Sequence, residues 1–213
     1  MIYLDYSANT PVSPRVLQSF TDAAARYVGN PNSNHPAGLA AKAAIDEATA
    51  RIAAALGVQP DEIIYTSGAS ESNNTAIRGT LHASRHIGRH VLTTPLEHPS
   101  VSGCLTAAME RGYENDMLSV GHDGRIDPEE VRSLLRPDTV LVAMTAVDSE
   151  LGTVQPVREV ARALRGVANC CLHVDATQAI GKLPFSFDEV DTVTFAPPKF
   201  GGIVGPGVLF NRH

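Results

Sequence analysis

The run TVLVAMTA, at residues 139–146, contains no charged residue. A strand with one solvated face would alternate apolar and polar residues, whereas a parallel strand buried on both faces reads as a continuous run. Parallel strands need crossover connections, which are usually helices. The run therefore predicts an α/β protein in which helices cover a mostly parallel sheet.

The rest of the chain alternates between short β-rich runs and segments with helical periodicity. The expected strands cover residues 62–66, 90–94, 171–174, 192–195 and 207–210. The expected helices cover residues 35–56, about 70–86, 99–111 and 156–164, with another beginning at Asp127-Pro128-Glu129-Glu130. This alternation predicts a three-layer α/β/α fold. No repeat or low-complexity linker interrupts it, so we expect one domain over residues 1–213.

The composition fits a soluble α/β protein, since 43% of the residues are hydrophobic, 19% are charged and the formal net charge is −6. The chain has no dense run of lysine and arginine, which argues against a nucleic-acid surface. No apolar stretch has transmembrane length. The start lacks a basic segment followed by an apolar one, so we expect no signal peptide.

Three cysteines occur, Cys104, Cys170 and Cys171. None of them belongs to a CxxC pair or a metal-type cluster, so we expect no metal site. An odd number without a secretion signal points to reduced thiols and a cytoplasmic location. Free cysteines are usually buried packing residues, and we interpret all three in this way.

Polar groups follow several expected strands, at the edge where α/β sheets bind ligands. The segment TSGASESN (66–73) lies where a strand turns into a helix, and its backbone N–H groups with the Ser70 hydroxyl would suit an anion. Turn geometry alone also explains such a segment and is favoured without other evidence. His98 could stack on a planar ligand or move protons, although a surface or capping role is commoner.

Asp175 ends the apolar strand 171–174, where a carboxylate is costly unless it meets a cation or a donor. A protonated pyridine nitrogen would be such a partner, and a helix-capping role is an equal alternative. Lys199 lies in the segment PPKFGG, after the strand 192–195. A lysine for Schiff-base chemistry needs partial desolvation, and an exposed loop lysine is the plain alternative.

The order of these segments is more specific than any one of them. The chain resembles cysteine desulfurases of the class V aminotransferase family from about Ile2 to Phe210. The most specific part is HVDATQ (173–178) followed by GKLP (181–184). The other matching stretches are YLDYSANTP (3–11), GNPNSNH (29–35), TSGASESN (66–73), EH (97–98) and ELGTVQP (150–156).

The resemblance implies the large domain of a fold-type I pyridoxal-phosphate transferase, acting as a homodimer with pyridoxal 5'-phosphate as cofactor. Lys199 matches the lysine that forms the internal aldimine. Asp175 matches the carboxylate that keeps the pyridine nitrogen protonated, which makes the ring an electron sink. The remaining expected contacts are Gln178 at the phenolic oxygen, His98 on the ring face and in proton transfer, and Ala69 and Ser70 at the phosphate.

The resemblance also implies the reaction. The substrate would be L-cysteine or a similar amino acid, and the product L-alanine. A cysteine thiolate of the enzyme attacks the substrate sulfur and becomes a persulfide. Its sulfur then passes to an acceptor protein for iron–sulfur clusters or thio-cofactors.

Three departures qualify the resemblance. The chain ends at His213, before the smaller domain that in the family carries the persulfide-forming cysteine and the arginine for the substrate carboxylate, so we expect an incomplete enzyme that a complementing chain could complete. Ala196-Pro197-Pro198 replaces Ser-Gly-His, whose two side chains bind the phosphate, at a cost of roughly 3 kcal/mol in cofactor affinity. Asp148-Ser149 replaces two asparagines, and Ser149 is shorter than the asparagine that approaches the phenolic oxygen.

These departures leave two alternatives to a cysteine desulfurase. One is a catalytically inactive relic or interaction protein, which would keep the fold but not the chemistry. The other is a different class V activity, such as a transaminase or a lyase, which the Asp148-Ser149 change keeps open.

Overall fold

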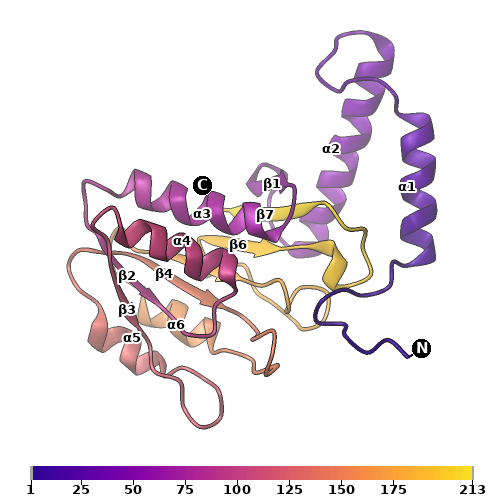
Figure 1. Cartoon of the computed structure of the whole chain (residues 1–213). Coiled ribbons are helices and arrows are strands. Elements are labelled where there is room, and N and C mark those ends of the chain that lie inside the picture. Colours follow the sequence, from indigo (N-terminus) through magenta and orange to yellow (C-terminus); the bar gives the residue numbers. More distant parts are fainter. Residues whose placement is uncertain (1, 213) are drawn as a thin grey trace. The chain divides into compact units, whose positions relative to one another are not determined.

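The computed structural model describes residues 2–212, and its organising element is a seven-stranded sheet (Figure 1). The strand order is β1-β7-β6-β5-β4-β2-β3. The pairs β3–β2, β2–β4, β4–β5 and β5–β6 are parallel, and β7 runs antiparallel to β6. The strands are β1 (Ile63–Thr66), β2 (His90–Thr93), β3 (Glu114–Met117), β4 (Thr139–Thr145), β5 (Cys171–Asp175), β6 (Thr192–Phe195) and β7 (Gly207–Asn211). The mostly parallel sheet is confirmed.

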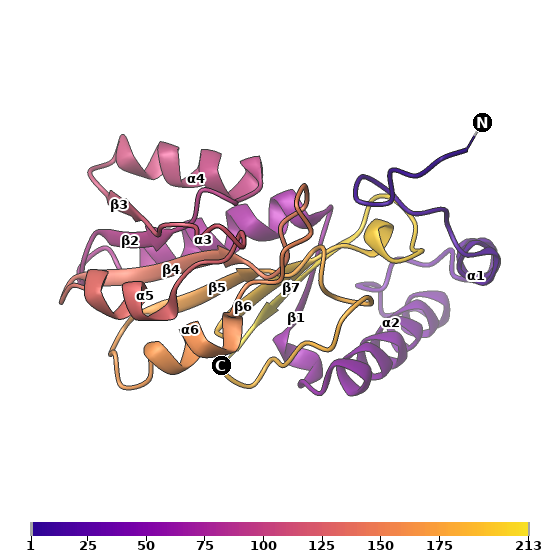
Figure 2. The same ribbon diagram turned by 90° about the horizontal axis from the view of Figure 1, so that it is seen from below.

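Helices cover both faces of this sheet. Figure 2 shows α3 (Ala69–Ala83) and α4 (Pro99–Met109) on one face, and α5 (Pro128–Leu134) and α6 (Val157–Ala163) on the other. All seven residues of β4 are buried, as expected for a central parallel strand with both faces covered. The predicted three-layer arrangement is therefore confirmed.

A cluster of apolar side chains packs between the sheet and the helices α3 and α4. Ile77 and Leu81 of α3 pack with Val101 and Leu105 of α4 over Leu141 of β4. Each of these side chains is at most 5% exposed. This packing holds the first turns of α3 and α4 against the carboxyl ends of the parallel strands.

The chain divides into two compact units. The second unit, Ile64–Ala196 with Gly205–His213, holds the sheet and its covering helices. The first unit, Met1–Ile63 with Pro197–Val204, holds α1 (Pro14–Arg26), α2 (Pro36–Leu56) and the short 3-10 turns η1 (Pro60–Glu62) and η2 (Pro197–Lys199). Lys199 therefore belongs to the first unit.

The end signals of α2 behave as the sequence predicts. Gly57 follows the helix in the left-handed conformation, with φ of 72°, which glycine adopts without steric cost. At the other end His35 is the cap, and its Nδ1 accepts a hydrogen bond from the Gly38 backbone N–H at 3.2 Å. None of the helices in residues 2–212 combines the length and apolarity that crossing a membrane requires.

Two elements were not predicted. The strand β3 has the polar sequence ENDM and lies at the sheet edge, where it pairs only with β2. Helix α1 buries none of its residues within this chain. The strand β3 lacks an apolar pattern, so periodicity could not reveal it, whereas α1 carries Val16, Leu17 and Phe20 at helical spacing and was not recognised.

Candidate active site

Asp175, the last residue of β5, is a buried carboxylate at the carboxyl edge of the sheet. It is 6% exposed. Its Oδ1 accepts a hydrogen bond from the Thr177 backbone N–H at 3.0 Å, and its Oδ2 accepts one from Asn73 Nδ2 at 2.8 Å. No lysine, arginine or histidine described in the second unit forms an ion pair with it. A carboxylate has about four acceptor positions, so roughly two remain for a ligand.

Two hydroxyls near Asp175 also lack partners. Thr177 lies two residues after it, and Thr194 of β6 is its register partner across the sheet. The Oγ1 atoms of both threonines are buried without a hydrogen-bond partner among the residues that the structure describes. Buried polar atoms are normally satisfied, so this edge has spare capacity for the polar groups of a ligand.

His98 caps α4 and is linked to Asp175 through other side chains. Its Nδ1 accepts hydrogen bonds from the Ser100 backbone N–H at 3.1 Å and from Ser100 Oγ at 2.8 Å. Ser100 Oγ in turn accepts from Asn73 Nδ2 at 2.9 Å. The His98 side chain is exposed. Both roles weighed for it are thus compatible, since the ring caps the helix and still presents its other nitrogen.

Glu97 is a functional candidate that the sequence did not reveal beyond its place in the matching pair EH. Its Oε1 accepts hydrogen bonds from Thr94 Oγ1 at 2.7 Å and from the Thr145 backbone N–H at 2.8 Å. Its Oε2 is buried and has no partner among the described residues. Burial, reinforced by the carboxylates of Asp175 and Asp148, raises the pKa of Glu97 to about 8. Glu97 is therefore mostly protonated at neutral pH.

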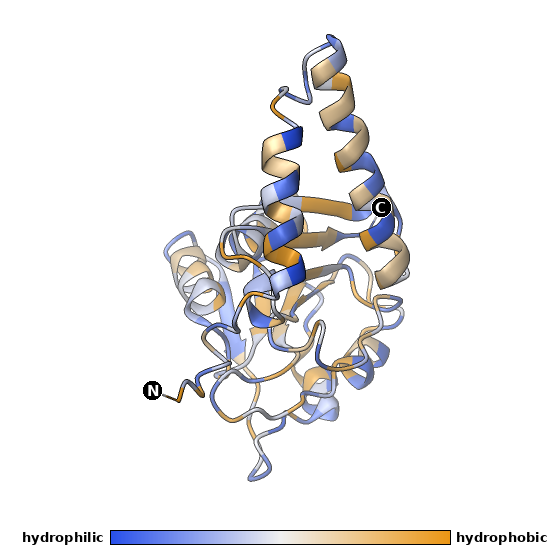
Figure 3. Cartoon of the chain, turned by 90° about the vertical axis from the view of Figure 1, so that its right-hand side faces the viewer, coloured by the Kyte–Doolittle hydropathy of each residue, from blue (hydrophilic) through white to orange (hydrophobic). Residues whose placement is uncertain are grey.

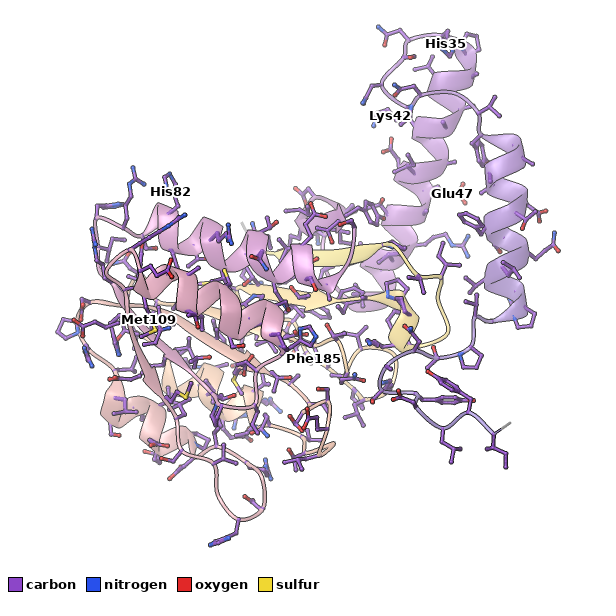
Figure 4. The ribbon with its side chains drawn as sticks, in the orientation of Figure 1. His35, Lys42, Glu47, His82, Met109 and Phe185 are labelled. Atoms are coloured by element: carbon purple, nitrogen blue, oxygen red, sulfur yellow. The ribbon has the colours of Figure 1, made fainter. Side chains whose placement is uncertain are left out.

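The start of α3 places backbone N–H groups at the same edge of the sheet. Ala69 and Ser70 occupy its first turn, where N–H groups have no partner within the helix. Gly68 precedes them with φ of 151°, and a Cβ on Gly207 would lie 2.4 Å from the Gly68 carbonyl carbon, so two bare backbones meet there. Figure 4 labels His82 and Met109 near the other ends of α3 and α4, away from these first turns. The site is compatible with an anion.

Within the first unit, the N-terminal segment forms hydrogen bonds with the turn that contains Lys199. The Pro198 carbonyl accepts hydrogen bonds from both the backbone N–H and Oγ1 of Thr10, each at 2.8 Å. Thr10 Oγ1 also accepts from the Gly201 backbone N–H at 2.6 Å. Lys199 Nζ donates to the Ala8 carbonyl. The motif SANTP at residues 7–11 thus has a structural role, which is to fix the lysine turn.

The remaining predicted residues differ in their surroundings. Gln178 is half-buried, and its Oε1 accepts a hydrogen bond from Lys182 Nζ at 2.7 Å. Asp148 is buried, and its Oδ1 accepts from the backbone N–H groups of Glu150 and Leu151, so its carboxylate caps the following turn. Ser149 lies exposed in that turn.

The three cysteines have the surroundings of packing residues. Cys104 lies in the core between α3 and α4 and is 5% exposed. Burial raises the pKa of Cys170 to about 12 and that of Cys171 to about 11. Since the thiolate is the reactive form, these two thiols are unreactive at neutral pH. The structure supports the interpretation that none of them is a nucleophile.

A family model described as aminotransferase class-V matches residues 2–213. The chain belongs to the class V aminotransferase family. It is 38% identical over its full length to the NifS/IcsS protein homolog of Lactobacillus delbrueckii subsp. bulgaricus, of which it covers 56%. It is 37% identical to the mitochondrial cysteine desulfurase of Saccharomyces cerevisiae, of which it covers 43%. The chain spans about half the length of the curated relatives it matches.

Solved structures of similar proteins have the same fold. A NifS-like protein superposes with a TM-score of 0.96 at 36% identity, over 99% of this chain and 59% of the other. A structure titled SspA in complex with cysteine superposes with a TM-score of 0.94 at 33% identity, over 100% of this chain and 61% of the other. The resemblance to cysteine desulfurases is therefore confirmed, together with the fold that it implied.

Proposed function

We propose that this class V chain provides the pyridoxal-phosphate-binding part of a cysteine desulfurase, which converts L-cysteine to L-alanine and leaves the sulfur as a persulfide on an acceptor thiol. The observation that carries the proposal is Asp175, a buried carboxylate with spare acceptor positions and no cation partner described in its unit. Relatives named cysteine desulfurase match along the whole chain. A structural neighbour was solved with cysteine.

The residues present fit pyridoxal phosphate in chemistry. A buried carboxylate is stabilised by a cation, and a protonated pyridine nitrogen is a planar cation that needs one acceptor. The partnerless hydroxyls of Thr177 and Thr194 add polar capacity beside Asp175. When bound, the cofactor supplies an electron sink that stabilises negative charge on the substrate.

Each proposed residue has a distinct task. Asp175 accepts a hydrogen bond from the protonated ring nitrogen. His98 covers the ring face, and its Nε2 can move a proton. Gln178 binds the phenolic oxygen. Lys199 provides the amine that holds the cofactor covalently. The first turn of α3, at Ala69 and Ser70, binds the phosphate.

The phosphate site is weaker than the family pattern. Ala196 is buried and offers no polar side chain, Pro197 and Pro198 have no N–H group, and the Pro198 carbonyl is engaged by Thr10. The exposed Ser149 contributes little to the ring. We therefore propose a cofactor affinity below that of a chain with the usual Ser-Gly-His.

The persulfide is proposed to form on a thiol outside the three cysteines of this chain. The acceptor thiol attacks the substrate sulfur, a C–S bond breaks, and an S–S bond forms, so the substrate leaves as L-alanine after taking up a proton. Cys104, Cys170 and Cys171 are buried or hold their protons. The acceptor thiol would come from a complementing chain or a sulfur-acceptor protein, in a pathway that serves iron–sulfur clusters or thio-cofactors in the cytoplasm.

A titration with pyridoxal phosphate tests the proposal. We expect a visible absorption band of a protein-bound Schiff base, because Lys199 supplies the amine that such a band requires. L-Cysteine should then change this band, while L-alanine should change it less. The absence of any band would favour the inactive alternative. A band that responds only to other amino acids would favour a transaminase or lyase.

We also propose a homodimer, on the evidence of apolar side chains left uncovered in the first unit. Figure 3 shows apolar residues along α1 and α2. Val16, Leu17 and Phe20 of α1 are 38%, 54% and 52% exposed, and Leu39 and Ile45 of α2 are 53% and 45% exposed. Such uncovered apolar surface is typical of an interface.

Light scattering with size-exclusion chromatography measures this assembly directly. We expect a mass of two chains for the wild type, and a shift toward one chain for the double variant Leu17→Glu, Phe20→Glu, because two charges would have to be buried. The matched control places glutamate at the exposed polar positions Gln18 and Thr21 of the same helix. A wild type that runs as a single chain would contradict the proposal.

A further inference from the structure

A buried chain of polar side chains connects the two candidate cofactor-contacting groups, Asp175 and His98. At its centre is Asn73 of α3, which is 0% exposed. The Nδ2 of Asn73 donates hydrogen bonds to Asp175 Oδ2 at 2.8 Å and to Ser100 Oγ at 2.9 Å. An amide nitrogen has two hydrogens, so both are used, one toward the carboxylate and one toward the hydroxyl that binds His98.

The other end of the Asn73 amide is held by a second histidine. His173 of β5 is 0% exposed, its Nε2 lies 3.0 Å from Asn73 Oδ1, and its Nδ1 lies 2.8 Å from Thr192 Oγ1. Burial lowers the pKa of His173 to about 4, so the ring is neutral at pH 7 and carries one proton. Because Asn73 Oδ1 can only accept, that proton lies on Nε2, and Nδ1 accepts from the Thr192 hydroxyl.

This arrangement admits one placement of protons. If the Asn73 amide were turned over, its oxygen would face the Asp175 carboxylate, and no hydrogen would lie between these two acceptors. In the correct orientation Ser100 accepts from Asn73, so its own hydrogen goes to His98 Nδ1. The proton of a neutral His98 is therefore on Nε2.

We infer that Asn73 and His173 are positioning residues of the candidate site: Asn73 orients the Asp175 carboxylate and directs the Ser100 hydroxyl hydrogen to His98, while His173, held by Thr192, donates to Asn73 Oδ1 and fixes the plane of the amide. The inference rests on the proposed function, since it assumes that Asp175 and His98 both face the cofactor. Asn73 thereby connects Asp175, the group proposed for the ring nitrogen, to His98, the group proposed for the ring face.

The chain offers a matched control for this inference. Asn74 is the next residue of the same helix, and its Nδ2 donates to two backbone carbonyls, those of Ser70 and Ser100. Asn73→Ala and Asn74→Ala remove the same amide from adjacent positions. They differ in the side chains that lose a partner, which are Asp175, Ser100 and His173 for Asn73 alone.

The first measurement needs no cofactor. Nitrogen-15 NMR of histidine-labelled protein reports which ring nitrogen carries the proton. In the wild type we expect His98 to be protonated on Nε2 and His173 on Nε2. In Asn73→Ala the preference of His173 for Nε2 should be lost because its acceptor is removed, while His98 keeps its tautomer through the Ser100 backbone N–H. In Asn74→Ala both tautomers should remain. A wild-type His173 with its proton on Nδ1 would overturn the inference, even if the variants fail to fold.

The second measurement is the dissociation constant of pyridoxal phosphate. Asn73→Ala should weaken binding by about tenfold or more, because a hydrogen bond to a charged group is lost and Asp175 is no longer oriented. Asn74→Ala should leave it near the wild-type value. Thr192→Val keeps the shape of the side chain but removes the hydroxyl that holds His173, so it should weaken cofactor binding in part. His173→Gln restores a donor to Asn73, so it should preserve most of the binding.

The outcomes separate the inference from the proposed function. If the wild type does not bind the cofactor, the proposed function fails, and the NMR tautomers still decide whether the hydrogen-bond chain exists. If the wild type binds but Asn73→Ala and Asn74→Ala have equal affinity and equal His173 tautomers, the inference fails alone.

Discussion

Lys199→Ala is expected to abolish covalent attachment of pyridoxal phosphate completely. The sequence contains only three lysines, Lys42, Lys182 and Lys199. Lys42 forms an exposed ion pair with Asp46, and Lys182 donates to Gln178. Lys199 alone lies on a turn fixed by hydrogen bonds on both sides, through Pro198 and Gly201. A defined position favours one amine as the Schiff-base partner.

Borohydride reduction followed by intact-mass and peptide analysis measures this attachment. The wild type, Lys42→Ala and Lys182→Ala should each gain one reduced cofactor on the peptide that contains Lys199. Lys199→Ala should gain none at a lysine, and its fold can be checked by thermal unfolding. If Lys199→Ala retains the adduct and Lys182→Ala loses it, the assignment of the lysine is wrong.

Glu97→Gln is expected to remove a large pH dependence of stability. The pKa of Glu97 is raised from 4.5 to about 8 in the folded chain, chiefly by burial. The folded state therefore keeps a proton that the unfolded chain releases, and its stability falls as pH rises from about 4.5 to about 8. At pH 7 the loss is on the order of 3 kcal/mol, from 1.36 kcal/mol per pKa unit. Glutamine cannot titrate, so this slope disappears.

Chemical denaturation at several pH values between 5 and 8 (roughly the range in which Glu97 titrates) measures the effect. His173 titrates in the opposite sense, because its pKa is lowered to about 4 and its contribution grows as pH rises from about 4 to 6.5. The difference between wild type and Glu97→Gln cancels this contribution. The exposed Glu47, labelled in Figure 4, offers the control Glu47→Gln, which should keep the wild-type slope. Equal slopes for all three proteins would show that Glu97 is not protonated in the folded chain.

The local pattern of the sequence was sufficient for the central elements. The apolar run at 139–146 predicted a strand buried on both faces, and the structure has β4 over Thr139–Thr145 with every residue buried. The helix expected at 35–56 appears as α2, with Gly57 ending it. Such signals depend on neighbours a few residues apart, so they survive without knowledge of the fold. β3 was missed because it lacks that pattern, whereas the apolar spacing of α1 was present and was not recognised.

The candidate site residues came from the resemblance, and the sequence by itself placed Asp175 and His98 only at the ends of their strands. The contacts that determine the chemistry of these two residues could not be predicted from the sequence. Asn73 meets Asp175 across 102 positions and His173 across 100, and Glu97 meets Thr145 across 48. These meetings depend on the order and register of strands and on how α3 packs over them.

The sequence motifs of this chain thus determined the family, the mostly parallel sheet and the side chains available for chemistry. Only the tertiary structure decided which of those groups are buried, which share hydrogen bonds, and where their protons lie. The physical reason is that burial and hydrogen bonding are set by atoms brought together from distant segments, and one local sequence is compatible with many such surroundings.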